Sequence, residues 1–313
     1  MGFKKPKFWD TEKLSLWSLL LLPFSVIFLL MTWLRRISSN FQTHQKNKPI
    51  ICVGNIYIGG TGKTPLAIEI FKFLKSVGKN PSFIKKYYSF IIDEIRMLKE
   101  IGETFDARNR KVAINLSENK GYDVAILDDG FQDFSIKPNF SILCFNSKQL
   151  VGNGLLIPAG PLRETLKSIL RADCIMINGE KTPETIKFEQ KIKEKFKNKK
   201  INFFYSKYKI KNIEKFRDKE IAAFAGIGNP SNFFNLLKEN NLNLKKTFSF
   251  PDHHNYSQQD FNKITEDDNF MIVTTKKDYY RINEDQKKNC DFIDVNLEIE
   301  NKENFEDLIK RNL

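Results

Sequence analysis

The residues of this chain most able to do chemistry form one glycine-rich run: Gly59, Gly60, Thr61, Gly62, Lys63 and Thr64. The run follows an apolar stretch at 50–53 and precedes a helix predicted over 63–76. Backbone N–H groups in such a turn converge on an anion, and the helix N-terminus adds partial positive charge. Lys63 can reach the β- and γ-phosphates, and the Thr64 hydroxyl can bind Mg²⁺. The run therefore predicts a nucleoside triphosphate site.

The spacing of the run departs from the usual phosphate-binding loop. A glycine is expected five residues before Gly62, but Tyr57 stands there, and the other nearby glycines are at 54, 59 and 60. A glycine-rich turn that merely ends in Lys-Thr is the alternative interpretation. The strand before the turn and the helix after it favour phosphate binding.

Two acidic residues, Asp128 and Asp129, follow a second apolar run at 124–127. An apolar strand ending in acid places carboxylates at the C-terminal edge of a sheet, where ligands bind in open α/β folds. We therefore expect Asp128 or Asp129 to hold Mg²⁺ opposite Thr64.

Two further segments carry polar groups in an unusual setting. A glycine- and proline-rich loop spans 151–164, and it could form a wall of a site or only a structural connection. His253 and His254 follow Asp252, and a histidine paired with a carboxylate can take a proton near neutral pH. A capped turn before a helix at 257–264 is equally compatible with this second segment.

Composition limits the classes of partner. The chain has 313 residues, 41% of them hydrophobic, and a net charge of +13, which favours anionic partners. The lysines are scattered and no nucleic-acid-binding module is present, so we expect no nucleic-acid partner. The four cysteines include no C-x-x-C pair, which indicates buried reduced thiols rather than a zinc site.

An uncharged segment at 14–34 is long enough to cross a bilayer. Basic residues flank both of its ends, and Pro23 interrupts it. A simple span with a cytosolic N-terminus would place the phosphate loop on the side away from ATP. We therefore expect a hairpin or interfacial helix with both ends cytosolic, while a single span or a buried soluble helix stays open.

From residue 50 the pattern alternates strands and helices, which indicates an α/β fold. We expect a P-loop NTPase-like, mainly parallel sheet with helices on both faces, a second and smaller α/β domain, and a membrane-associated N-terminal helix. The domains are predicted at 1–40, 41–205 and 206–313, with runs 202–212 and 291–299 pairing between the last two. Predicted strands lie at 50–54, 81–85, 111–115, 123–128, 140–145 and 173–177, and predicted helices at 63–76, 91–101 and 162–170.

Taken together, the motifs resemble the tetraacyldisaccharide 4′-kinase family of lipid A biosynthesis. The matching stretches are GNIYIGGTGKTP, DVAILDDGFQ, GNGLLIPAGPLRE, AGIGNPSNFF, FPDHHNY and VTTKKD. The resemblance implies transfer of the ATP γ-phosphate to the 4′-hydroxyl of a tetraacylated glucosamine disaccharide 1-phosphate. It also implies an enzyme at the cytoplasmic face of the inner membrane, with the lipid and the membrane surface as partners.

The resemblance implies site residues as well. Asp93 matches the aspartate of the family's Asp-Glu pair and would activate the hydroxyl, while His253 would orient or tune it. Lys63 would serve catalysis as well as ATP binding. The segment 85–90 is shorter than the corresponding lid region of the family. Asp133 and Lys276 also differ from the residues usual in the family.

Three other classes of protein share parts of the pattern. A membrane-recruited ATPase acting on protein partners would carry a signature lysine where Ile58 stands. A GTPase would carry an Asn-Lys-x-Asp segment, which residues 276–278 match poorly. A non-catalytic nucleotide-binding scaffold would have no need of Lys63, Thr64 and the two aspartates.

Overall fold

The computed structural model describes residues 5–11, 13–40, 48–266 and 269–313, and these form two compact units. The large unit contains Lys5–Tyr87, Gly102–Lys207 and Leu297–Leu313. The small unit contains Tyr88–Ile101 and Tyr208–Asn296.

The large unit is built around an eight-stranded sheet in the order β12-β7-β6-β5-β1-β4-β2-β3. All pairings from β3 to β7 along this order are parallel, as predicted. The strands are β1 (Ile50–Gly54), β2 (Pro81–Lys86), β3 (Thr104–Ala107), β4 (Val124–Asp128), β5 (Phe140–Asn146), β6 (Cys174–Asn178), β7 (Asn202–Ile210) and β12 (Val295–Ile299). Neighbours β1 and β4 carry the glycine-rich run and Asp128 at their carboxyl ends, where open sheets bind ligands.

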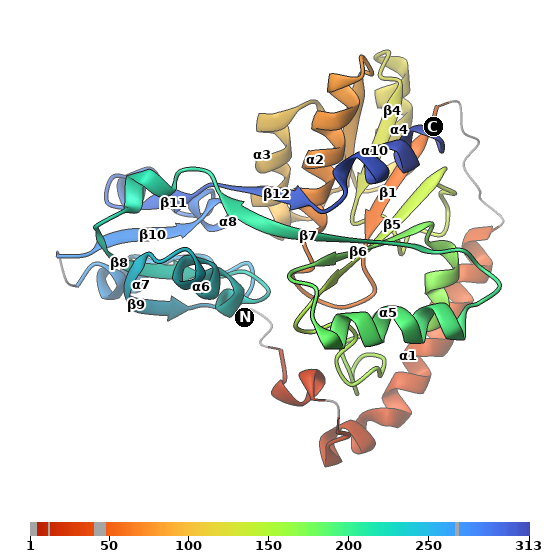
Figure 1. The fold of residues 1–313 in the computed structure, drawn as a ribbon, viewed down its shortest axis with the longest axis horizontal. Helices are drawn as coiled ribbons and strands as arrows, with labels where there is room; N and C mark the ends of the chain where they lie inside the picture. The colour runs from red at the N-terminus through yellow and green to blue at the C-terminus, as the bar shows by residue number, and fades with distance from the viewer. Residues whose placement is uncertain (1–4, 12, 41–47, 267–268) are drawn as a thin grey trace. The chain divides into compact units, whose positions relative to one another are not determined.

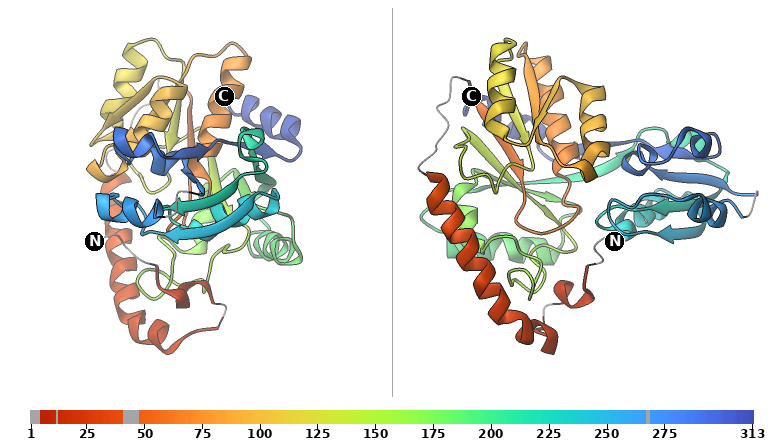
Figure 2. Two further views of the ribbon diagram at one scale, coloured as in Figure 1. Left: turned by 90° about the vertical axis from the view of Figure 1, so that its left-hand side faces the viewer. Right: turned by 180° about the vertical axis from the view of Figure 1, so that it is seen from behind.

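Helices cover both faces of this sheet (Figures 1 and 2). Successive strand residues point to opposite faces. Phe83 accordingly stacks on Phe71 of α2 with ring centroids 4.6 Å apart, whereas Ile84 joins the core cluster that includes α4 and α5 residues. The helices of the unit are α2 (Lys63–Ser76), α4 (Arg110–Asn119), α5 (Pro183–Lys195) and α10 (Lys302–Lys310), with 3₁₀ helices at Lys7–Asp10 and Leu166–Arg171.

The strand predicted at 111–115 is wrong, because that stretch lies inside α4. Buried Arg110, Ala113, Ile114 and Ser117 recur at helical spacing, and Asn109 caps the helix by accepting from the Lys111 N–H. The actual strand β3 comes just before it. The helix predicted at 162–170 is a 3₁₀ helix over Leu166–Arg171.

The small unit contains a four-stranded parallel sheet in the order β11-β10-β8-β9. Its strands are β8 (Glu220–Ala225), β9 (Asn243–Ser249), β10 (Met271–Thr275) and β11 (Asp291–Ile293). Its helices are α3 (Ile92–Ile101), α6 (Pro230–Glu239), α7 (Gln258–Ile264), α8 (Lys276–Tyr279) and α9 (Glu284–Lys287), with 3₁₀ helices at Ser89–Ile91 and Ile213–Phe216. The predicted run 291–299 is divided, because β11 joins the small sheet and only β12 neighbours β7.

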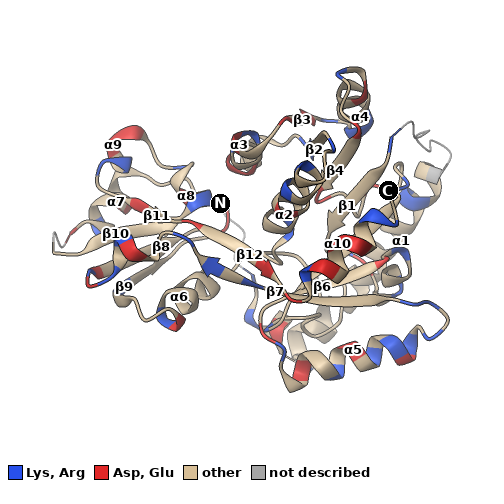
Figure 3. Ribbon diagram, turned by 45° about the horizontal axis from the view of Figure 1, so that its top comes forward, with Lys and Arg blue, Asp and Glu red and all other residues tan. Residues whose placement is uncertain are grey.

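The N-terminal apolar segment forms the long helix α1 (Leu16–Asn40), which runs along the outside of the large unit (Figures 1 and 2). Among the described residues it is the one helix long and apolar enough to cross a membrane, with a mean hydropathy of 2.1 over an 18-residue window within Leu16–Ser39. Only 11% of that window is buried. Elsewhere on the large unit, basic and acidic residues alternate along α5 (Figure 3).

Candidate active site

The glycine-rich run forms the loop between β1 and the N-terminus of α2. Gly59 and Gly62 have φ angles of 120° and 85°, values that a Cβ makes unfavourable. Asn55 is buried in the loop, and its Nδ2 donates to Thr61 Oγ1 at 2.9 Å and to the Gly59 carbonyl at 3.3 Å. The N-cap of α2 is Gly62, which has no side chain to accept from the N–H groups of the first turn. The loop therefore has the form of an anion site.

Asp128 lies against this loop, because β4 pairs with β1 and places Asp128 opposite Val53. The Thr64 hydroxyl donates to Asp128 Oδ2 at 2.9 Å. Asp128 is fully buried, and its other oxygen, Oδ1, has no hydrogen-bond partner among the described residues. The two residues expected to face each other are thus in contact, while their binding of a metal stays a prediction.

Asp129 adopts a left-handed backbone conformation, with φ of 59°, and its carboxylate faces two cations. Lys63 Nζ lies 3.8 Å from Asp129 Oδ1, and Arg163 Nη1 lies 3.2 Å from the same oxygen. Burial would raise the pKa of the Asp129 carboxyl, but the charges of Lys63 and Arg163 outweigh burial and hold that pKa well below its usual range. Asp129 is therefore a charged partner of both cations at neutral pH.

Lys85 is a member of this site that the sequence analysis did not include. Its ammonium group lies 2.6 Å from Asp128 Oδ2, and both side chains are buried. The contact arises because β2 pairs with β4 and sets Lys85 beside Asp128. The available signal was a lysine directly after the apolar pair Phe83 and Ile84, and it needed the strand order to be interpreted.

The glycine- and proline-rich loop at 151–164 forms backbone hydrogen bonds with the segment just before the glycine-rich run. The Ile58 N–H donates to the Pro161 carbonyl at 2.9 Å, and the Arg163 N–H donates to the Ile56 carbonyl at 2.7 Å. The Arg163 guanidinium, which contacts Asp129, also donates to Gln132 Oε1 at 3.2 Å. Of the two interpretations left open for this loop, the one that makes it a wall of a site fits these contacts.

A second polar cluster lies within the small unit, where Asp93 of α3 faces His253. His253 Nδ1 is 3.8 Å from Asp93 Oδ1, and the Asp93 side chain is 3% exposed. His253 has φ of 58°, and its N–H donates to the Gly226 carbonyl at 3.1 Å. That bond joins the turn after β9 to the turn after β8. The two residues that the resemblance paired are therefore brought together, although their catalytic roles stay predictions.

Cations surround Asp93. Burial would raise the pKa of the Asp93 carboxyl, but the charges of Lys277 and Arg281 oppose burial, and the pKa is lowered. The Arg281 guanidinium donates to Asp93 Oδ2 through both Nε and Nη2, and its Nη2 also lies 3.2 Å from His253 Nδ1. Arg281 lay outside all the motifs, so the sequence analysis missed it.

His254 has a different environment from its neighbour. Its Nε2 lies 3.1 Å from Asp260 Oδ2, and its ring stacks on Phe250 with centroids 4.8 Å apart. Asp260 forms a capping box with Ser257 at the start of α7. The capped-turn interpretation therefore describes His254, whereas His253 belongs to the polar cluster.

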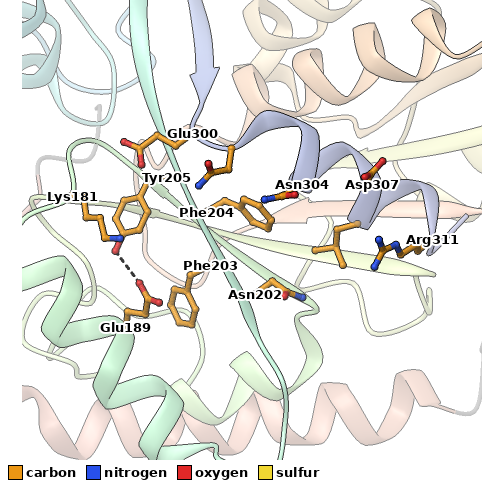
Figure 4. Close-up of a pocket in the computed structure, with 12 residues that line it drawn as sticks. Lys181, Glu189, Asn202, Phe203, Phe204, Tyr205, Glu300, Asn304, Asp307 and Arg311 are labelled. Atoms are coloured by element: carbon orange, nitrogen blue, oxygen red, sulfur yellow. Dashed lines mark hydrogen bonds between the residues drawn. The ribbon is translucent and has the colours of Figure 1, made fainter.

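A pocket of about 430 Å³ opens between β7 and α10 in the large unit (Figure 4). Tyr205 donates to Glu189 at 3.2 Å in this pocket. None of the predicted site residues lines it. The pocket is therefore distinct from both clusters.

Comparison with known proteins gives concordant results. The profile of the family described as tetraacyldisaccharide-1-P 4′-kinase matches residues 17–313. A tetraacyldisaccharide 4′-kinase of Pelagibacter ubique is 40% identical over 317 residues, covering 100% of this chain and 99% of the relative. One of Rickettsia canadensis is 35% identical, with coverage of 95% and 93%. The crystal structure of LpxK from Aquifex aeolicus in complex with ATP is 25% identical, with a TM-score of 0.72 and coverage of 94% and 99%.

Proposed function

The chain belongs to the tetraacyldisaccharide 4′-kinase family, and on that premise we propose how its residues divide the work of phosphoryl transfer. The reaction moves the ATP γ-phosphate to the 4′-hydroxyl of a tetraacylated glucosamine disaccharide 1-phosphate, in lipid A biosynthesis. The large unit holds the phosphate donor, and the small unit supplies the groups that act on the acceptor hydroxyl.

ATP is held by the loop formed by Gly59, Gly60, Thr61, Gly62, Lys63 and Thr64. The uncapped N-terminus of α2 and the loop N–H groups bind the phosphates, as a helix N-terminus binds anions. Lys63 moves from its 3.8 Å contact with Asp129 to the β- and γ-phosphates, where it stabilises the charge that builds up during transfer. Asp129 and Arg163 set the starting position of Lys63.

The residues present fit a magnesium ion. Asp128 offers a buried carboxylate oxygen that accepts no hydrogen bond from the part of the chain that the structure describes, next to the Thr64 hydroxyl. Thr64 and Asp128, with Asp129 nearby, would hold Mg²⁺, which would neutralise charge on the phosphates of ATP.

Asp93 accepts the proton of the attacking hydroxyl, and His253 orients that hydroxyl beside it. Asp93 is held ionised by its neighbours, so an acceptor oxygen is available over the whole neutral range. The observation that carries this part of the proposal is the convergence of Asp93 and His253, from distant parts of the chain, to 3.8 Å.

The decisive experiment incubates the purified chain with radiolabelled ATP, Mg²⁺ and a panel of acceptors. The panel contains the tetraacylated disaccharide 1-phosphate, its deacylated form and a protein mixture. Label is expected in the acylated disaccharide. Release of labelled phosphate without labelled lipid would instead support the membrane-recruited ATPase, which the comparisons do not favour.

We also propose that α1 lies in the membrane interface at the cytoplasmic face of the inner membrane. Its exposed apolar residues Leu20, Phe24, Ile27, Met31 and Leu34 recur at helical spacing along one face. The opposite face carries Ser18 and Ser25, which contact the loop at 151–164.

The attachment of α1 to the large unit argues against a simple span. Ser18 accepts from Asn153, Ser25 donates to the Leu156 carbonyl, and the Arg36 guanidinium lies 5.8 Å from the centre of the Phe134 ring. These contacts extend over about 27 Å of helix. A bilayer core is about 30 Å thick, so a crossing helix would pull polar parts of the large unit into it.

Placing two charges on the exposed face of α1 is expected to release the protein from membranes. The variant Ile27→Glu/Met31→Glu changes side chains that are 54% and 63% exposed, so the fold should persist while burial in lipid becomes unfavourable. Vesicle flotation of the full chain measures the bound fraction.

The matched control replaces two exposed apolar residues of α4, as Val112→Glu/Leu116→Glu. This variant should float like the wild type. If both double variants float equally well, the membrane contact lies elsewhere on the molecule.

A further inference from the structure

Arg281 uses every hydrogen-bond donor it has. Nε donates to Asp93 at 3.0 Å, Nη1 donates to the Gly226 carbonyl at 2.6 Å and to Asp278 at 2.9 Å, and Nη2 donates to Asp93 and to His253 Nδ1. A guanidinium has five N–H groups in a fixed planar fork. The Arg281 side chain is 7% exposed, so water does not compete freely for these donors.

The contact with His253 fixes where the imidazole proton lies. Arginine can only donate, so a hydrogen bond between Nη2 and His253 Nδ1, which lie 3.2 Å apart, requires the ring nitrogen to accept. A neutral ring that accepts at Nδ1 carries its proton on Nε2. A carboxylate facing Nδ1, as Asp93 does at 3.8 Å, would by itself favour the opposite tautomer. Arg281 therefore opposes the arrangement in which Nδ1–H donates to Asp93.

Arg281 is also tied firmly to the core of the small unit. It pairs with the fully buried Asp278, which in turn accepts from the Tyr256 hydroxyl at 2.9 Å and the Thr275 hydroxyl at 2.7 Å. Gly226 has no room for a side chain, because a Cβ there would lie 2.7 Å from the Tyr256 hydroxyl. The Nη1 side of the Arg281 guanidinium is thus held by Asp278 and the Gly226 carbonyl, both of which are fixed by the packing around them.

We propose that Arg281 is a positioning residue that holds Asp93 in place and locks His253 in the tautomer protonated at Nε2. The proposal rests on the proposed function of Asp93 and His253, and it names the nitrogen through which His253 acts. In this tautomer Nε2–H donates to the oxygen of the substrate hydroxyl, and the proton of that hydroxyl passes to Asp93. His253 Nδ1 takes no proton during the reaction.

Nuclear magnetic resonance of the full chain in micelles, labelled with ¹⁵N-histidine, tests the tautomer without any substrate. The chain has three histidines, so His253→Gln assigns the signal. In the wild type the neutral His253 ring should show Nε2 protonated and Nδ1 unprotonated. In Arg281→Lys, which keeps the charge but loses the fork, a protonated Nδ1 should appear. A wild-type ring protonated at Nδ1, or identical rings in both proteins, would overturn the proposal.

Kinetics supply the second readout. Arg281→Lys and Arg281→Met should lower kcat about 10-fold or more, with an unchanged KM for ATP. The acid limb of kcat/KM should move to higher pH in Arg281→Met, because Asp93 then faces Lys277, Glu94 and His253 without the guanidinium, while Asp252 pairs with Lys277. Arg96→Met is the control, since this exposed arginine of α3 donates to the Tyr280 carbonyl. Arg96→Met should leave kcat, the KM for ATP and the acid limb of kcat/KM unchanged.

The outcomes separate the two proposals. If Arg281→Met fails to fold by circular dichroism, Arg281→Lys decides. If the wild type labels no lipid, the proposed function fails, and the tautomer measurement still decides the role of Arg281. If the wild type labels lipid and Arg281→Lys matches it in kcat, pH profile and tautomer, Arg281 is only structural.

Discussion

Lys63→Ala is expected to lower kinase turnover by about 10²–10³-fold or more while leaving the fold intact. The ammonium group supplies positive charge where the transferred phosphate carries most negative charge, and nothing else in the loop replaces it. The packing of α2 depends on Leu66, Ala67 and Ile70 rather than on Lys63. Transfer of label from ATP to the acylated disaccharide measures turnover, and circular dichroism monitors the fold.

The control for this variant is Lys72→Ala on the same helix. Lys72 is 43% exposed and pairs with Glu69 one turn away, far along α2 from the loop. Its loss should leave turnover within about twofold of the wild type, since exposed ion pairs contribute little to stability. Normal turnover in Lys63→Ala would rule out the assigned role of the phosphate loop.

The donor half of the site could be predicted because its information is local. The glycine-rich run specifies its own backbone conformation and the helix that follows it, so Lys63 and Thr64 were placed by residues within a dozen positions. Asp128 was placed by one further rule, that acids at the end of an apolar strand lie at the carboxyl edge of a sheet. Neither step required knowledge of the strand order.

The residues that were missed depend on tertiary structure. Lys85 reaches Asp128 only because β2 lies beside β4, and no pattern in the sequence states that order. Arg281 reaches Asp93 across the small unit, from a segment whose sequence resembles an ordinary helix end. Asp93 itself was found through the resemblance. A lone acid at the start of a helix is usually explained by its favourable interaction with the helix dipole and does not by itself indicate catalysis.

The wrong strand at 111–115 has a local physical cause. Val112, Ala113 and Ile114 form a short apolar run, which is compatible with a buried strand or with one face of a helix. Asn109 decides for the helix by capping it, while Val112 is left 51% exposed. Capping residues therefore carry information that hydrophobic runs lack.

Asp93→Asn is expected to lower kcat by about 10²–10⁴-fold with little change in ATP affinity, because the amide keeps the shape of the carboxylate but cannot take a proton. Its control is Glu100→Gln on the same helix, an acid 49% exposed that pairs with Lys276 at 3.2 Å. ATP affinity is measured separately by equilibrium binding. An unaltered kcat in Asp93→Asn would remove Asp93 from the role of proton acceptor.

The pH dependence of the wild type provides an independent check on Asp93. Its pKa is lowered below the ordinary value of 3.8, so the carboxylate persists from neutral pH down to that value and is lost only as the pH falls further. The same sign applies to stability: the pairing of Asp93 with Arg281 contributes fully above the ordinary pKa of 3.8, and the contribution is lost as the pH falls from there through the lower pKa of the folded state. Rates measured from pH 8 to pH 4 should therefore show no loss attributable to Asp93. A fall in rate between pH 8 and pH 4 that is absent in Asp93→Asn would contradict this expectation. It would show that the pKa of the Asp93 carboxyl is not lowered by the surrounding cations.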